Sequence, residues 1–284
     1  MSTKENATLQ PVAVGAFGAA VPAVPASDSF GWAGRFLRRQ SVLYTLSIVA
    51  GLILWDLVAR QFSGFILAPP SAVAVKLWQG IVSLQLVVLY SHSLGHMVLG
   101  FLLATAVAVP LGLLMGRNGT VYQALDPLVN AIYAIPIIAF VPFIIIWFGL
   151  FFEARVALVF LMCVFDMLLV IATGARNVER QLLDVGRSFG AGRWLLIRGI
   201  LLPASLPFLF TATRIGLVRA VNAMITAELF LAAVNLGAFM KAAANRFDSA
   251  SLLAVLLILC LTGLGLQEVV KRLEVRLLPW HVRD

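Results

Sequence analysis

The run VALVFLMCVFDMLLVIATGA at residues 156–175 decides the fold class, because only one charged residue, Asp166, interrupts its apolar side chains. An α-helix needs about 20 consecutive apolar residues to cross a bilayer. Comparable apolar runs occupy approximately residues 41–59, 96–116, 205–232 and 251–269. These runs predict five helices that cross a membrane.

Residues 127–152 form a further, irregular span. They contain no charged side chain but include Pro127, Pro136 and Pro142, and proline removes a backbone hydrogen bond from a helix. Broken helices are tolerated in a membrane where neighbouring protein satisfies the freed carbonyls. We therefore expect a span followed by a bent or re-entrant piece, and an all-α, polytopic membrane protein with about six transmembrane helices.

The composition excludes a water-soluble globule. Of the 284 residues, 61% are hydrophobic and only 12% are charged, whereas roughly a quarter of the residues in a soluble domain are charged. Residues 1–40 lack a helical period, so we expect a disordered cytoplasmic tail there, followed by a transmembrane domain over residues 41–284. Small residues such as Gly100, Ala104, Ala106 and Gly112 predict close contacts between helices.

The distribution of basic residues predicts the orientation. Six spans place both termini and the charge-rich segment 176–203 on one side, and most of the 21 Lys and Arg residues lie there. Because positively charged loops stay in the cytoplasm, we expect both termini and this segment to be cytoplasmic. The net charge of +8 then reports orientation, and no nucleic-acid partner is expected.

Patterns for catalysis and metal binding are missing from the sequence. The histidines His92, His96 and His281 have no metal-ligand spacing with Cys, Asp or Glu. No lysine follows a glycine, as the phosphate-binding P-loop requires. We expect a protein that is not an enzyme, binds no metal and leaves ATP to another subunit wherever ATP is used.

The segment QLLDVGRSFGAGRWLLIRGILLPASLP at residues 181–207 sets apolar residues among arginines, as in an amphipathic helix. Gly190 and Gly192 allow a bend, and Pro203 predicts a stop. A helix of this kind can dock into the groove of a partner protein. It can equally lie on anionic lipid with its arginines at the headgroups, and the pattern favours neither.

This segment resembles the EAA motif in permease subunits of ATP-binding-cassette (ABC) importers. That motif reads Glu-Ala-Ala, three residues, glycine, nine residues, isoleucine, one residue and Leu-Pro. Here Asp184-Val185-Gly186 is followed at the same spacing by Gly190, Ile200 and Leu202-Pro203. Gly186 replaces an alanine, which weakens that helix by up to about 1 kcal/mol.

The resemblance extends from about Ala68 to the C-terminus and points to the nitrate, sulfonate and taurine branch. Its motifs are APPSAV (68–73), LDPLVNAIYAIPIIAFVPFIIIWFG (125–149), GARNVERQLLDVGRSFGAGRW (174–194) and LLPASLPFLFTATRIGLVRA (201–220). It implies a coupling surface for an ATPase subunit, formed by Asp184, Gly186, Arg187, Gly190, Arg193, Ile200 and Pro203.

The resemblance also implies the partners and the cargo. It implies a homodimer in the lipid of the bacterial inner membrane, ABC ATPase subunits that bind the ATP, and a periplasmic or lipid-anchored solute-binding protein. The solute would be small and anionic, such as nitrate, a sulfonate or taurine.

Polar residues inside the spans are candidates for the solute pathway, because charges there usually face protein or a water-filled path. The candidates are Asn130, Tyr133, Pro136, Asp166, Arg219 and Glu228. Arg219 and Glu228 lie about 13.5 Å apart along one helix, so each needs another partner. Asp166 is equally consistent with a transport role and with structural pairing to Arg219, whereas Arg214 is expected to be structural.

Two other classes of protein remain as alternatives. In an ion-coupled secondary carrier or channel, the intramembrane acids would be ion sites, but such a protein has no need of a docking loop at residues 176–203. A non-transporting scaffold would tolerate neutralisation of Asp166, Arg219 and Glu228.

Overall fold

The structure is a computed structural model that describes residues 40–278, except 63, 65, 179 and 233. The expected tail therefore lies outside the described residues, apart from Gln40. The contacts divide the chain into Met1–Ile53 and Leu54–Asp284. The first unit contributes only the start of helix α2 to the described structure, and the packing below concerns the second unit.

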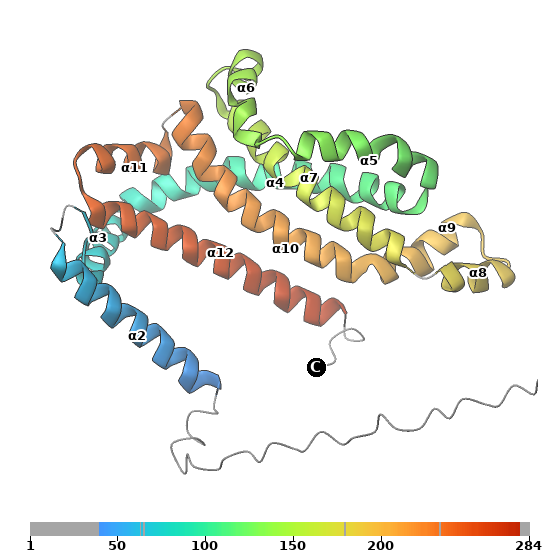
Figure 1. The fold of residues 1–284 in the computed structure, drawn as a ribbon, viewed down its shortest axis with the longest axis horizontal. Coiled ribbons are helices and arrows are strands. Elements are labelled where there is room, and N and C mark those ends of the chain that lie inside the picture. The colour runs from blue at the N-terminus through green and yellow to red at the C-terminus, as the bar shows by residue number, and fades with distance from the viewer. Residues whose placement is uncertain (1–39, 63, 65, 179, 233, 279–284) are drawn as a thin grey trace, which may run out of the picture. The chain divides into compact units, whose positions relative to one another are not determined.

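The described residues are helical and contain no strand (Figure 1). The α-helices are α2 (Gln40–Gln61), α3 (Pro70–Val82), α4 (Gln85–Arg117), α5 (Gly119–Tyr133), α6 (Val141–Phe148), α7 (Phe152–Asn177), α8 (Arg180–Ser188), α9 (Arg193–Leu196), α10 (Leu202–Ala227), α11 (Asn235–Asn245) and α12 (Ser249–Leu277). A 3₁₀-helix, η1 (Ile137–Phe140), precedes α6, and the π-helices η2 (Ile197–Leu201) and η3 (Glu228–Ala232) flank α10.

The helix lengths agree with the predicted number of spans. Five helical segments in the described part of the chain are long and apolar enough to cross a membrane: Val42–Gln61, Gln85–Arg117, Phe152–Asn177, Trp194–Leu231 and Ser249–Leu277. A sixth arises if α5 and the η1–α6 segment count as one span, broken by a bend of 86°. The all-α, polytopic architecture with about six spans is confirmed, including the irregular third span.

The second span begins at Gln85 rather than near His96. The polar residues Ser91, His92 and Ser93 hide this start in the sequence. In the structure, the hydroxyls of Ser91 and Ser93 donate to the carbonyls of the preceding helical turn, at 2.8 and 3.0 Å. A serine satisfied in this way does not end a helix.

Helices α4 and α7 form the centre of the fold through a row of small residues. Gly100 faces Val159, and a Cβ atom added to Gly100 would lie 2.6 Å from the Val159 Cβ. Further along, Gly116 faces Ala175, with the same 2.6 Å separation. The later residue of α4 faces the later residue of α7, so the two helices run parallel. The broken α5–α6 span between them carries the chain back across.

The sequence prediction of close contacts holds for three of its four small residues. Gly100, Ala104 and Gly112 are buried, but Ala106 is exposed and Ala108 is buried in its place. The reason is the helical period: Gly100, Ala104, Ala108 and Gly112 recur every four residues and share one face, which Ala106 does not.

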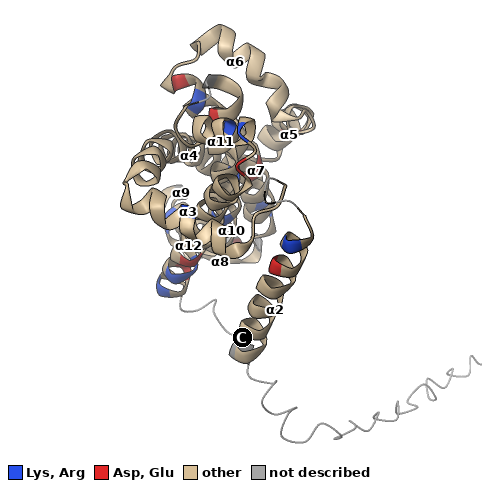
Figure 2. Cartoon of the chain, turned by 90° about the vertical axis from the view of Figure 1, so that its left-hand side faces the viewer, with Lys and Arg blue, Asp and Glu red and all other residues tan. Residues whose placement is uncertain are grey.

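Helix α10 packs antiparallel to α7. Gly174, near the end of α7, faces Phe208 near the start of α10, whereas the Cys163 thiol, farther back in α7, donates to the Gly216 carbonyl at 3.4 Å. Helix α12 lies along α10 (Figure 1). Figure 2 shows few charged residues along these helices, with a cluster near the end of α12.

Two short helices lie where α4 and α12 begin. Val73 of α3 packs with Ala254 of α12, and Leu236 of α11 packs with Leu86 of α4. Helix α11 lies in a segment that the sequence analysis left between spans. The exposed Lys241 and Asn245 of this helix make its apolar, inward-packing face hard to recognise in the sequence.

Candidate functional site

Helix α8, the first helix of the segment 176–203, ends in a turn that requires glycine. Gly190 has a φ of +77°. Its N–H donates to the Arg187 carbonyl at 2.8 Å, and the Ala191 N–H donates to the Gly186 carbonyl at 3.1 Å. This pair of bonds defines a Schellman motif, in which a left-handed residue follows the helix. The expected bend at Gly190 is therefore present and turns the chain towards α9.

Gly186 provides a close contact on the inner side of this loop. A Cβ atom at Gly186 would lie 2.7 Å from Leu196 Cδ2 and 2.6 Å from Ile200 Cδ1. Helix α8 therefore folds back onto α9 and η2. Gly186 and Ile200, which are far apart in the motif, meet here, and Gly186 allows the approach that a larger residue would block.

The sequence analysis expected Pro203 to stop the helical segment, and this prediction is wrong. The π-helix η2 continues directly into α10, and Pro203 lies in the first turn of α10. Proline is compatible with the first turn of an α-helix because its fixed φ suits the helix. Pro203 thus lies within the continuous helical segment Trp194–Leu231 and does not end it.

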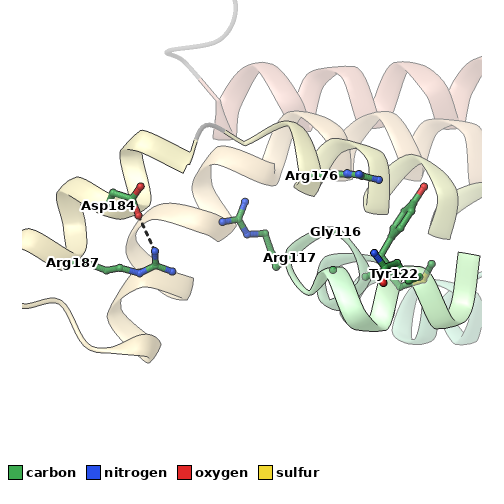
Figure 3. A pocket seen from close by; sticks show the side chains of 9 residues that line it. Gly116, Arg117, Tyr122, Arg176, Asp184 and Arg187 are labelled. Atoms are coloured by element: carbon green, nitrogen blue, oxygen red, sulfur yellow. Dashed lines mark hydrogen bonds and ion pairs between the residues drawn. The ribbon is translucent and has the colours of Figure 1, made fainter.

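The outer side of the loop is apolar and open. Phe189 is 87% exposed and Trp194 is 72% exposed, and Val185 and Leu195 are also exposed. Asp184 and Arg187 form an exposed ion pair, with 2.8 Å between Asp184 Oδ1 and an Arg187 guanidinium nitrogen (Figure 3). The side chain of Arg193 lies outside the described residues. An exposed apolar patch bordered by charges is typical of a protein-binding or membrane-binding surface.

A second polar cluster lies within the membrane-length helices. Arg219 Nε of α10 lies 2.8 Å from Asp166 Oδ2 of α7, and the Tyr133 hydroxyl of α5 donates to Asp166 Oδ1 at 3.2 Å. Three candidate residues from three helices therefore meet. The side chain of Asp166 is only 13% exposed, but that of Arg219 is 46% exposed. This charged face needs protein or a water-filled path beside it, because lipid would leave it poorly solvated.

Glu228 lies apart from this cluster and has no exposed surface. Its carboxylate accepts hydrogen bonds from Ser93 Oγ at 2.6 Å, Asn235 Nδ2 at 2.9 Å and the Gly237 N–H at 2.9 Å. It joins α4 and α11 to the end of α10. The sequence analysis did not find these partners, because no residue pattern relates positions so far apart in the chain.

The remaining polar candidates have local roles in the structure. Asn130 Nδ2 donates to the Asp126 carbonyl at 2.8 Å within α5. Pro136 immediately precedes η1, at the bend between α5 and α6. Arg214 pairs with Glu274 and joins α10 to α12. Among the described residues, no three His, Cys, Asp or Glu side chains gather as a metal site would require.

The fold and the loop define a class of protein. A bundle of membrane-length helices with a broken span, an intramembrane charge cluster and an exposed apolar loop is typical of a membrane permease that works with a protein docked on the loop.

Comparison with known proteins identifies the family within this class. Residues 108–277 match the family described as "Binding-protein-dependent transport system inner membrane component". The match covers more than half of the chain, and the protein belongs to this family. It is thus an ABC importer permease, a multi-pass membrane protein of a transport system and not an enzyme.

Individual relatives carry different solutes. The chain is 28% identical to the taurine transport system permease protein TauC of Escherichia coli, over 86% of this chain and 92% of the relative. It is 31% identical to the riboflavin transport system permease protein RibX of Chloroflexus aurantiacus, over 92% of this chain and 95% of the relative. It is 26% identical to the nitrate import permease protein NrtB of Leptolyngbya laminosa, over 66% of this chain and 67% of the relative.

A solved structure confirms the fold. A chain of the MetNI methionine ABC transporter, in an inward-facing conformation, superimposes with a TM-score of 0.61 at 20% identity. The match covers 69% of this chain and 97% of that chain. At this identity the likeness establishes the fold alone.

Proposed function

We propose that two copies of this chain form the pathway by which a small anionic solute, such as nitrate, a sulfonate or taurine, enters the cytoplasm. Separate ABC ATPase subunits bind the ATP and dock on the loop that contains α8. A periplasmic or lipid-anchored solute-binding protein delivers the solute from the opposite side. Both termini are cytoplasmic in this arrangement.

The exposed outer side of the loop is the observation that carries the proposal. Leu196 and Leu201 are buried, but Phe189 and Trp194 are left uncovered. Large exposed aromatics are the residues that most often dominate the binding energy of a protein interface. The Gly190 turn and the Gly186 contact hold this surface in a fixed shape, which a lever between ATPase and membrane helices requires.

The anionic class of the solute rests on Arg219. Its guanidinium group is partly open within a membrane-length helix, and its partner Asp166 is also held by Tyr133. Arg219 is the more open partner of this pair, so its guanidinium group can exchange Asp166 for the anionic group of a passing solute. The relatives differ in solute. The name of TauC includes taurine, which is a sulfonate, and the name of NrtB includes nitrate, which is an anion.

The ATPase proposal is tested by binding to a candidate ATPase subunit in detergent. Replacing Phe189 and Trp194 together by alanine removes two exposed aromatics and should weaken the complex by about 30-fold or more. Trp78 (69% exposed) and Phe247 (71% exposed) are matched controls, because they are equally open but lie outside the loop. Equal binding by both double variants would remove the basis for the docking surface.

The pathway proposal is tested by ATP-driven uptake in proteoliposomes that contain the whole transporter. Arg219→Gln should abolish uptake of an anionic solute while the complex with the ATPase still assembles. Arg214→Gln is the matched control. Arg214 lies on the same helix as Arg219, also pairs with an acid and has a side chain that is 41% exposed. Uptake that needs no ATPase subunit and no ATP would instead favour an ion-coupled carrier.

A further inference from the structure

A groove of about 590 Å³ lies between α10 and α12, two membrane-length helices that pack side by side (Figure 1). The two helices run in opposite directions. Arg214, in the first half of α10, pairs with Glu274 near the end of α12. Ile225, near the end of α10, packs against the cluster of Val255 near the start of α12. Most side chains that line the groove are apolar, so it offers a hydrophobic surface along both helices.

Three neutral polar side chains interrupt this apolar lining: Asn222 and Thr226 of α10 and Gln267 of α12. The Thr226 hydroxyl donates to the Asn222 backbone carbonyl at 2.8 Å. Within the described residues, the side-chain amides of Asn222 and Gln267 form no hydrogen bond. An amide without a partner is costly in hydrocarbon. The groove therefore needs a polar occupant beside these two residues rather than an acyl chain alone.

The groove continues from the charged cluster at Arg219. Asn222 and Thr226 follow Arg219 by three and seven residues, so the three share one face of α10. Val218, which precedes Arg219 in the chain, lines the groove. The Arg219 side chain is 46% exposed while it pairs with Asp166. An anion held at Arg219 therefore has the Asn222 amide and the groove beside it.

We propose that this groove is a second binding site for the solute, suited to an organic anion with an oxyanion group and a short apolar body. Asn222 and Gln267 lie on opposite walls of the groove, and their side-chain N–H groups donate to the oxyanion oxygens. Leu256 and Leu259, which also line the groove, contact the apolar body. Neutral donors bind an anion more weakly than a guanidinium group does, so a solute that moves there from Arg219 is not trapped. The inference rests on the proposed anion pathway at Arg219 and adds the residues that select among anions.

Cys260 provides a reporter for the groove, because it lines the groove and is exposed, whereas Cys163, the other cysteine of the chain, is buried. The whole transporter in lipid nanodiscs, which leave both membrane faces open, is treated with two thiol reagents. One is sulfonatoethyl methanethiosulfonate, itself an organic oxyanion, and the other is trimethylammonioethyl methanethiosulfonate, a cation of similar size. Each rate is divided by the rate of the same reagent with free mercaptoethanol. On this scale the anion should modify Cys260 about tenfold faster than the cation.

Two outcomes of this labelling would overturn the proposal. If native Cys260 reacts with neither reagent while the denatured chain reacts fully, lipid or another protein covers the groove. If the two normalised rates are equal, water enters the groove but anions are not selected there.

The contribution of Arg219 to the groove is measured with the same reagents. Arg219→Gln should slow the modification of Cys260 by the anionic reagent about fivefold and should not slow the cationic reagent, because the groove loses its neighbouring cation. Arg214→Gln is the matched control, because Arg214 lies on the same helix and also pairs with an acid, but is not among the lining residues. It should change either rate by no more than about twofold. Equal effects of both variants would indicate attraction to basic residues in general and would contradict the site.

The amide and the apolar walls are tested by protection of Cys260. Ethanesulfonate, an unreactive organic anion, should protect Cys260 at a concentration about tenfold lower than nitrate, because nitrate has no apolar body to bury. Asn222→Leu keeps the size of the side chain but removes its donor, and should raise the protecting concentration of ethanesulfonate about tenfold. Asn245→Leu, at an exposed position of α11, is the matched control and should leave that concentration unchanged. Equal protection by nitrate and ethanesulfonate, or equal effects of the two leucine variants, would refute the second site.

Uptake by Arg219→Gln separates a failure of the groove from a failure of the proposed function. If this variant loses uptake but Cys260 shows no preference for the anionic reagent, the groove is refuted and the pathway at Arg219 stands. If the variant retains uptake, the pathway at Arg219 is refuted, and the groove with it.

Discussion

Gly190→Ala should loosen the loop that contains α8 through backbone conformation alone. A Cβ atom at Gly190 would meet nothing within 4 Å, so no clash opposes the substitution. The φ of +77° is the obstacle, since a non-glycine residue in this region costs roughly 1–2 kcal/mol. That cost should shift the local opening equilibrium of the loop by about 5- to 30-fold. Gly190→Asn should have a smaller effect because asparagine tolerates this conformation.

Hydrogen exchange of the Gly190 and Ala191 amides measures this opening, because these two N–H groups close the Schellman motif. Gly192→Ala is the matched control: its Cβ atom would also meet nothing within 4 Å, and Gly192 is not among the residues with a positive φ. It should leave exchange unchanged or slow it slightly, since alanine restricts the unfolded chain. Equal exchange rates in Gly190→Ala and Gly192→Ala would refute the conformational argument.

Three other predictions concern stability. Glu228→Ala should lower stability by about 3–5 kcal/mol in a denaturation assay in detergent, because it strands buried donors; a change under 1 kcal/mol would contradict this. Gly116→Ala should cost about 1–3 kcal/mol in the same assay, since its Cβ atom would lie 2.7 Å from a backbone oxygen of α7, whereas Gly119→Ala, with open space, should cost less. Burial raises the pKa of Asp248, but hydrogen bonds from neighbouring groups, including Lys76, outweigh it and hold the pKa below its ordinary 3.8. This carboxylate therefore stabilises the fold above pH 3.8, and the stability is lost as the pH falls through the lower folded-state pKa. Asp248→Asn should remove that part of the acid sensitivity, which denaturation midpoints between pH 7 and pH 3 would measure, and an unchanged slope would argue against the contact.

The loop illustrates the limit of motif reasoning. The sequence predicted a bent helical segment with Gly190 and Gly192 allowing the bend, and the structure places the turn at Gly190. The sequence did not predict that Gly186 admits Leu196 and Ile200, because that contact depends on how far the chain folds back after the turn. It also predicted a stop at Pro203, where the structure shows η2 continuing into the first turn of α10, a position that is compatible with proline.

For the intramembrane charges, too, the sequence predicted one part of the arrangement and the structure was needed for the rest. The distance along α10 correctly indicated that Arg219 and Glu228 could not pair with each other. Their actual partners come from other helices: Asp166 for Arg219, and residues of α4 and α11 for Glu228. The sequence analysis considered Asp166 beside Arg219, but could not determine that Tyr133 completes the cluster.

The sequence by itself determined the helical class, a count of about six spans and the family, because apolar length and motif spacing are local properties of the chain. The tertiary structure alone decided which side chains meet. Those contacts depend on the register between helices, which the small residues facing α7 set by allowing close approach. The parallel packing of α4 and α7 follows from that register.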